Sequence, residues 1–185
     1  MHDKRTIFFV TSNENKVREF RQILEPEIKV CHIRMAYREM RSDFPREIAE
    51  QSAKMLANEL KKAVVVEDSG LFINALNGFP GTCSAYIHKR IGLAGILKLM
   101  EGIRDRECVY MSAVAYCEQG KEAVSFLGEE NGIISRSPKG NFGFGHDPIF
   151  IPRGSKKSYG ENEGCERQKK FRRMAVLKLK EYICQ

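Results

Sequence analysis

Three features that would assign a chain to a class of protein are missing from these 185 residues. The longest apolar runs are four or five residues, whereas a membrane-spanning helix needs about 20, and the run at 7–10 is too short for the core of a signal peptide. The six cysteines include no C-x2-C pair, so neither a zinc module nor a disulfide framework is indicated. We therefore expect a protein of the reducing cytoplasm that does not enter a membrane.

What the chain does contain is enough apolar sequence for one sizeable core. It is 42% hydrophobic and 30% charged, which at this length predicts a single domain over residues 1–185, either undivided or built as two lobes that share a sheet. The net charge of +7 is concentrated near the C-terminus, and such a cluster attracts phosphates on a nucleotide or a polymer. The alternative is a solvated basic face. The basic residues are Arg153, Lys156, Lys157, Arg167, Lys169, Lys170, Arg172 and Arg173.

Strand and helix patterns alternate at the start of the chain, and strands dominate later. Apolar runs predict buried strands at 7–10 and 64–66, and apolar residues at helical spacing predict helices at 17–24, 48–60 and 93–100. Residues 109–116, 123–127 and 132–135 alternate like antiparallel strands. A last helix carries an apolar stripe of Met174, Leu177 and Tyr182. Together these elements predict an α/β fold.

The strand at 64–66 ends at two adjacent carboxylates. Three valines lead directly into Glu67 and Asp68, and carboxylate and water oxygens suit hard cations such as Mg²⁺. One interpretation is a site for a divalent cation and a water. The other is a strand that simply emerges into an acidic turn.

The first strand leads into the polar loop Thr11-Ser-Asn-Glu-Asn-Lys16, which precedes a helix. Free backbone N–H groups and the positive end of the helix dipole favour a phosphate there. Thr11 and Asn13 add side-chain donors, and Lys16 adds a full charge. No Walker-type G-x-x-x-x-G-K is present, and the alternative is a helix in which Asn13 or Asn15 only caps the first turn.

Four motifs, taken in order, resemble those of the inosine triphosphate pyrophosphatase family, also called the non-standard purine NTP pyrophosphatases. They are T-S-N-E-N-K at 11–16, E-D-S-G-L at 67–71, A-L-N-G-F-P-G-T at 75–82 and G-F-G-H-D-P-I-F at 143–150. The resemblance extends from Ile7 to about Ile183. It implies an elongated mixed sheet with flanking helices and two lobes around a central nucleotide cleft, commonly in a homodimer. It also implies Mg²⁺-dependent hydrolysis of ITP, dITP and XTP to the monophosphate and pyrophosphate, rather than binding to nucleic acid.

The resemblance assigns roles at the hydrolytic site. Asp68 matches the family's catalytic aspartate, which would bind the metal and act as general base for the attacking water. Glu39, in the segment Tyr37-Arg-Glu-Met40, aligns with a glutamate that helps to hold the metal, although the usual P-E-x-x-G context is absent and a solvated loop carboxylate is the alternative. Glu67 would support the metal or the water from a second layer. The triphosphate would be bound by Thr11, Ser12, Asn13, Glu14, Asn15, Lys16 and Ser69.

Base recognition is where the sequence departs from the family. His146 replaces the usual Tyr or Trp, and an imidazole stacks over less area while adding a hydrogen-bonding edge. The family's K-N-x-x-S-H-R is replaced by Glu166-Arg-Gln-Lys-Lys-Phe-Arg-Arg173, in two registers that differ by one residue. The Ser-His pair is missing in both. The residues that would contact the base are Phe144, Gly145, His146 and Asp147, with Arg167, Phe171 and Arg172 from the altered segment.

Three functions are compatible with these motifs. The first is a pyrophosphatase that clears abnormal purine triphosphates from the nucleotide pool. The second keeps that chemistry with a changed or relaxed base preference, because lost hydrogen bonds can change discrimination by factors of thousands. The third is a non-catalytic nucleotide or nucleic-acid binder. Retention of Asp68, Lys16, Glu39 and Asp147 argues against the third, since a binder has no need of a water-activating carboxylate.

Overall fold

The computed structural model describes residues 5–185, which form an α/β protein. Helices in this range are α1 (Glu14–Leu24), α2 (Pro45–Leu60), α3 (Ser84–Leu99) and α4 (Lys170–Cys184). Strands are β1 (Thr6–Val10), β2 (Lys29–Ile33), β3 (Val64–Ile73), β4 (Pro80–Gly81), β5 (Glu107–Cys117), β6 (Val124–Ile134) and β7 (Phe150–Pro152).

One mixed sheet contains all seven strands of the described chain. Its order is β2-β1-β3-β5-β6-β7, and β4 pairs with β3. Strand β1 runs parallel to β2 and β3, whereas β4 is antiparallel to β3 and β7 to β6. The predicted α/β fold class with a mixed sheet and flanking helices is confirmed.

The chain divides into two compact units. Unit 1 comprises residues 5–68, 112–128 and 172–185, and unit 2 comprises residues 69–111 and 129–171. Strands β3, β5 and β6 therefore each contribute residues to both units. The last residue of β3 in unit 1 is Asp68, and the first in unit 2 is Ser69.

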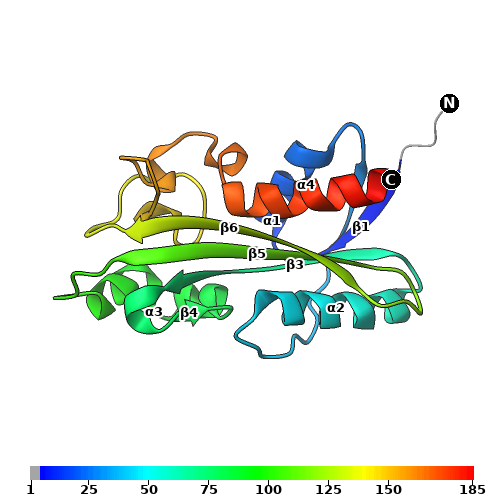
Figure 1. The fold of residues 1–185 in the computed structure, drawn as a ribbon, viewed down its shortest axis with the longest axis horizontal. Helices are drawn as coiled ribbons and strands as arrows, with labels where there is room; N and C mark the ends of the chain where they lie inside the picture. Colours follow the sequence, from blue (N-terminus) through cyan, green and yellow to red (C-terminus); the bar gives the residue numbers. More distant parts are fainter. Residues whose placement is uncertain (1–4) are drawn as a thin grey trace. The chain divides into compact units, whose positions relative to one another are not determined.

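In unit 1, helices cover both faces of the strands. Helices α1 and α4 lie on one side and α2 on the other, as Figure 1 shows. Because successive side chains of a strand point to opposite faces, Val65 joins the cluster with α1, while Val64 and Val66 join the cluster with α2. A strand buried on both faces must be apolar throughout, which explains the unbroken valine run before Glu67.

Unit 2 has its own apolar core. Leu71 of β3 and Ile96 of α3 belong to it, together with an aromatic group in which Tyr110 stacks on Phe171 with ring centroids 4.7 Å apart. Gly70 lies beside the backbone of β4, since a Cβ added there would lie 2.1 Å from the Gly81 carbonyl oxygen. The glycine of the E-D-S-G-L motif is therefore required by close strand packing next to Asp68.

Several elements differ from the sequence-based prediction. Strand β3 does not end at Glu67 and Asp68 as expected but continues through them to Ile73, because its later residues pair with β4. Helix α3 begins at Ser84 rather than near 93, because Gly92 has a non-helical backbone (φ 62°) that breaks the apolar spacing of the segment. The strands expected at 123–127 and 132–135 are one strand, β6, whose polar middle is held by its neighbours in the sheet. Strand β2 was not predicted, and it lies at the edge of the sheet beside β1.

Candidate functional site

The loop before α1 is a capped helix start. The Asn13 side chain accepts the backbone N–H of Asn15 at 2.9 Å, and the Thr11 hydroxyl accepts the N–H of Asn13 at 3.1 Å. The capping alternative is therefore present in the structure, and it occupies the side-chain oxygens of Thr11 and Asn13. Ser12 and Glu14 are exposed, and Glu14 pairs with Arg34 at 3.2 Å. Because the Thr11 and Asn13 oxygens act here only as acceptors, the Thr11 hydroxyl and the Asn13 amide group can still donate to a phosphate, together with Lys16 and the helix dipole.

Lys16 contacts Glu67 in the middle of strand β3. Its ammonium lies 2.6 Å from Oε2 of Glu67 and donates to the Glu67 carbonyl at 3.1 Å. The other carboxylate oxygen of Glu67 accepts from the Ser112 hydroxyl at 2.7 Å and from Nε of Arg172 at 3.0 Å. Both oxygens of Glu67 are therefore engaged, and its side chain is fully buried. All of these residues belong to unit 1.

The charges around Glu67 keep it ionised. Burial by itself would raise the pKa of this carboxyl, but the charges of Arg172 and Lys16, with hydrogen bonds from Lys16 and Ser112, lower the pKa to about 2. A carboxylate with such a low pKa is a poor proton acceptor at neutral pH. Glu67 is thus suited to anchoring Lys16 against β3, which leaves Asp68 as the candidate base.

Arg172 is held inside unit 1. Its guanidinium joins Glu67 to Glu19 of α1, and its side chain is only 3% exposed. Burial would lower the pKa of Arg172, but the charges and hydrogen bonds of the two glutamates raise it above its usual value. Both ends of the arginine fork are therefore occupied by protein carboxylates. The predicted contact of Arg172 with the base has no support in this arrangement.

Asp68 and Glu39 lie near the same tyrosine. The pKa of Tyr37 is raised by burial, then by the charge of Glu39 and a hydrogen bond to it, and then by the charges of Asp68 and Glu67. The charges of Glu39 and Asp68 therefore both act on Tyr37, and all three residues belong to unit 1. Asp68 is 9% exposed and Glu39 is exposed.

This donor set fits Mg²⁺ better than a closed metal centre. Within residues 5–185 no group of three or more His, Cys, Asp or Glu side chains is arranged to hold a metal. Mg²⁺ is commonly held by only one or two carboxylates, together with waters and substrate phosphates. Asp68 and Glu39 supply such oxygens, whereas those of Glu67 are committed to Lys16, Ser112 and Arg172.

The residues predicted for the base, apart from Arg172, belong to unit 2. Oδ2 of Asp147 accepts the backbone N–H of Phe144 at 2.6 Å. This hydrogen bond folds the G-F-G-H-D-P-I-F motif at 143–150 around the Asp147 carboxylate. Gly143 precedes this turn with φ 76°, and a Cβ there would lie 2.2 Å from the same oxygen. The same Oδ2 lies 2.9 Å from the ammonium of Lys169, which sits 3.9 Å from the centroid of the Phe144 ring.

His146 is 3% exposed, and its Nε2 atom is buried with no hydrogen-bond partner within the described chain. Its ring meets that of His88 from α3 edge to face, with centroids 5.0 Å apart. Burial, and to a lesser degree the charge of His88, lowers the pKa of His146 to about 4. The imidazole that replaces the family's aromatic residue is therefore neutral at pH 7.

The altered C-terminal segment, residues 166–173, is divided between surface and interior, and its Arg167, Lys170 and Arg173 are exposed. Lys169 and Arg172 are buried in ion pairs. Phe171 is 2% exposed and stacks on Tyr110 in the core of unit 2, so its ring is committed to packing. These positions leave the base-binding roles of Arg167 and Phe171 as predictions without structural support.

Several residues at these sites were not identified from the sequence. Ser112 could have been found, because it is a polar residue inside the apolar run of β5. Lys169 was included only in the basic cluster, and Glu19 has no local pattern that marks it. Their partners are far away in sequence, and only the folded chain brings them together.

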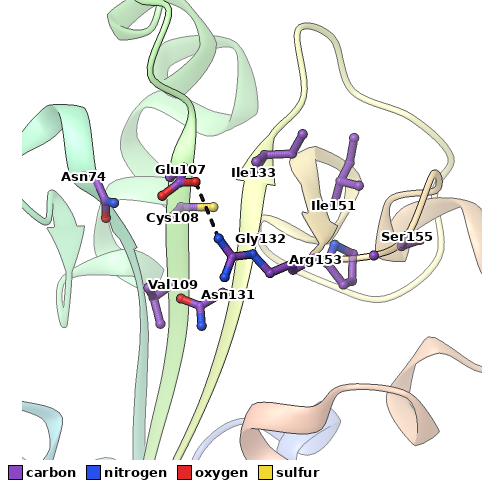
Figure 2. A pocket seen from close by; sticks show the side chains of 12 residues that line it. Asn74, Glu107, Cys108, Val109, Asn131, Gly132, Ile133, Ile151, Arg153 and Ser155 are labelled. Carbon is purple, nitrogen blue, oxygen red and sulfur yellow. Dashed lines mark ion pairs between the residues drawn. The ribbon is translucent and has the colours of Figure 1, made fainter.

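A shallow pocket of about 190 Å³ lies elsewhere in unit 2. Figure 2 shows its lining, which includes Asn74, Cys108 and Asn131, with an ion pair of 3.7 Å between Glu107 and Arg153. Its lining contains none of the residues predicted for catalysis or substrate binding.

Residues 7–182 match the model of the Ham1 family. The dITP/XTP pyrophosphatase of Methanopyrus kandleri is 47% identical over 156 residues, covering 84% of this chain and 83% of the relative. That of Korarchaeum cryptofilum is 41% identical over 177 residues, covering 96% and 95%. The solved structure of a HAM1 protein from Coxiella burnetii is similar with a TM-score of 0.85 and 25% identity, covering 97% of this chain and 98% of the other.

Proposed function

Because the chain belongs to the Ham1 family, we propose that it hydrolyses non-standard purine nucleoside triphosphates (ITP, dITP and XTP) to the monophosphate and pyrophosphate. The names of its relatives, dITP/XTP pyrophosphatases that align over most of their length, support this substrate class. The activity would clear deaminated purines from the nucleotide pool.

The observation that carries the proposal is the different roles of two adjacent carboxylates in β3, Glu67 and Asp68. Glu67 is held by Lys16, Ser112 and Arg172 and stays ionised. The next residue, Asp68, also carries a carboxylate, and the three valines that precede Glu67 in the strand are fully buried. Asp68 therefore adjoins the residue that anchors Lys16, and attack of water on a phosphoanhydride requires both a positioned base and a cation for the phosphate.

In the proposed reaction, Asp68 accepts a proton from water as the water oxygen bonds to phosphorus. The bond between the α and β phosphates breaks, and pyrophosphate leaves with the electron pair. Lys16 stabilises negative charge on the phosphate oxygens. Its side chain is 17% exposed, so a phosphate can approach it while Glu67 keeps it in place.

We also propose that Mg²⁺ takes part, held by Asp68 and Glu39. When bound, it would neutralise charge on the phosphate oxygens. Tyr37 would orient Glu39 through the hydrogen bond between them.

We further propose that the protein is a homodimer in the cytoplasm. The family resemblance supports the dimer, and all six cysteines are free thiols, as a reducing compartment favours. Light scattering at micromolar concentration would test the dimer. In the described chain, no helix is long and apolar enough to cross a membrane.

The test is pyrophosphate release from ITP, XTP, dITP, ATP, GTP and CTP, with Mg²⁺ and with a chelator. We expect Mg²⁺-dependent release that is fastest with the first three substrates. Release from ATP at the rate found with ITP would contradict the proposed substrate class. Absence of release from every nucleotide would contradict the proposed reaction.

A further inference from the structure

Helix α4 is capped by a buried glutamate that is distant in sequence. Oε2 of Glu130, in β6, accepts the backbone N–H of Lys170 at 2.9 Å and of Phe171 at 3.4 Å, and these are the first two residues of α4. The first N–H groups of a helix have no partner inside it, and a negative charge at that end is favoured by the helix dipole. The position of Glu130 therefore controls where the helix begins.

A tyrosine holds the glutamate in this position. The hydroxyl of Tyr159 donates to the same Oε2 at 2.6 Å, the length of a strong charge-assisted hydrogen bond. Glu130 is 6% exposed and Tyr159 2%, and the tyrosine ring packs on Phe150 with centroids 5.6 Å apart. The carboxylate thus has little freedom to move without losing several contacts.

The residue just before the capped turn is Lys169. Its ammonium is buried against Asp147 and the ring of Phe144, and a buried ammonium is tolerated only when it is closely paired. Since Lys169 is adjacent to Lys170, the hydrogen bond that places the N–H of Lys170 also sets the direction in which the lysine side chain leaves the backbone.

We propose that Glu130 is a positioning residue for base recognition: by holding the first turn of α4, it aims the Lys169 ammonium at Asp147 and Phe144. The inference rests on the proposed function, in which the motif at 144–147 contacts the purine. Glu130 itself touches no nucleotide and acts through Lys169. All of these residues lie in unit 2.

A kinetic test compares Glu130→Ala with Glu130→Gln. The alanine removes the acceptor, and we expect KM for ITP to rise at least tenfold while kcat changes less than threefold. The glutamine keeps an oxygen for the helix N–H groups and should restore KM to within threefold of the parent. Glu129→Ala is the matched control, because this neighbouring glutamate of β6 is exposed, and it should leave both constants unchanged.

A second readout does not depend on catalysis. An amine-acylating reagent, followed by mass spectrometry of the peptide that contains both lysines, should modify the exposed Lys170 readily and the buried Lys169 slowly in the parent. In Glu130→Ala, Lys169 should react at least tenfold faster relative to Lys170. In Glu130→Gln and Glu129→Ala, the ratio should stay at the parent value.

The two readouts separate the possible failures. A parent protein that releases no pyrophosphate overturns the proposed function, and the acylation ratio then decides the role of Glu130 alone. An unchanged ratio in folded Glu130→Ala, or a raised ratio with unchanged KM in an active protein, overturns the positioning role. If the alanine variant does not fold, Glu130→Asp replaces it, because aspartate keeps the charge but has a shorter side chain. We then expect a threefold rise both in KM for ITP and in the acylation of Lys169 relative to Lys170.

Discussion

Removal of Arg172 should destabilise the protein strongly, and the effect should depend on pH. Arg172→Met keeps the apolar stem but deletes the cation that joins Glu19 to Glu67. The side chains of these glutamates are 1% and 0% exposed, so two buried carboxylates would lose this cation, and Glu67 would keep its ion pair with Lys16. Breaking a buried ion pair by removing one partner costs about 3 to 5 kcal/mol.

The pKa of Glu67 reports how strongly its surroundings as a whole, including Arg172, favour the charged form. Its fall from 4.5 to about 2 corresponds to about 3 kcal/mol in favour of the folded state, at about 1.4 kcal/mol per unit. Because the folded pKa lies below the unfolded one, this stability is fully present above pH 4.5 and is lost as the pH falls toward 2. Without Arg172 the pKa of Glu67 rises, so the variant should be weakened most at neutral pH.

Urea unfolding of parent and variant at about pH 7 and about pH 4.5 provides the measurement. We expect a difference of about 3 to 5 kcal/mol at pH 7 that narrows on acidification, because the orphaned carboxylates can take up protons. Arg173→Met, at the exposed next position, should change stability by less than about 0.5 kcal/mol. Adding Glu19→Gln to Arg172→Met should recover part of the loss. A difference below about 1 kcal/mol, or one that is the same at both pH values, would refute this account of the network.

Three further predictions concern catalysis and pH. Asp68→Asn should fold and bind nucleotide normally yet lose about 10² to 10⁴ in turnover, and near-parental pyrophosphate release by the folded variant would remove Asp68 from the mechanism. Lys16→Ala should raise KM for ITP, XTP and dITP by similar factors, because a phosphate contact carries no base information; factors that differ more than about tenfold, or 1.4 kcal/mol, would show that Lys16 reads the base. His146 has a folded pKa of about 4, below its usual 6.5, so its contribution to stability is present above pH 6.5 and declines as the pH falls. The parent should therefore lose about 2 kcal/mol more than His146→Gln between pH 7 and pH 5 in urea unfolding, and equal losses would contradict the burial of a neutral imidazole.

Much of the fold was predictable because its signals are local. The valine run before Glu67 requires a strand buried on both faces, and the structure places it between two helix layers. The apolar spacing of α1 and α2 likewise reports which side of each helix is buried. Local signals misled at Gly92, which interrupts α3, and in β6 and β3, which continue through polar stretches paired within the sheet. They also misled in α4, where Met174 and Tyr182 of the expected apolar stripe are exposed.

The sequence by itself determined the buried strand that carries Glu67 and Asp68, the loop that places Lys16 at a helix start, and the order of motifs that marks the family. Only the tertiary structure decided which charged side chains are buried and paired inside the protein. Arg172 bonds to residues 105 and 153 positions away, and Glu130 reaches 40 positions to the start of α4. A charged residue in a polar segment has the same local pattern whether water or a buried partner neutralises it, and the energy that distinguishes the two comes entirely from groups that the chain brings together when it folds.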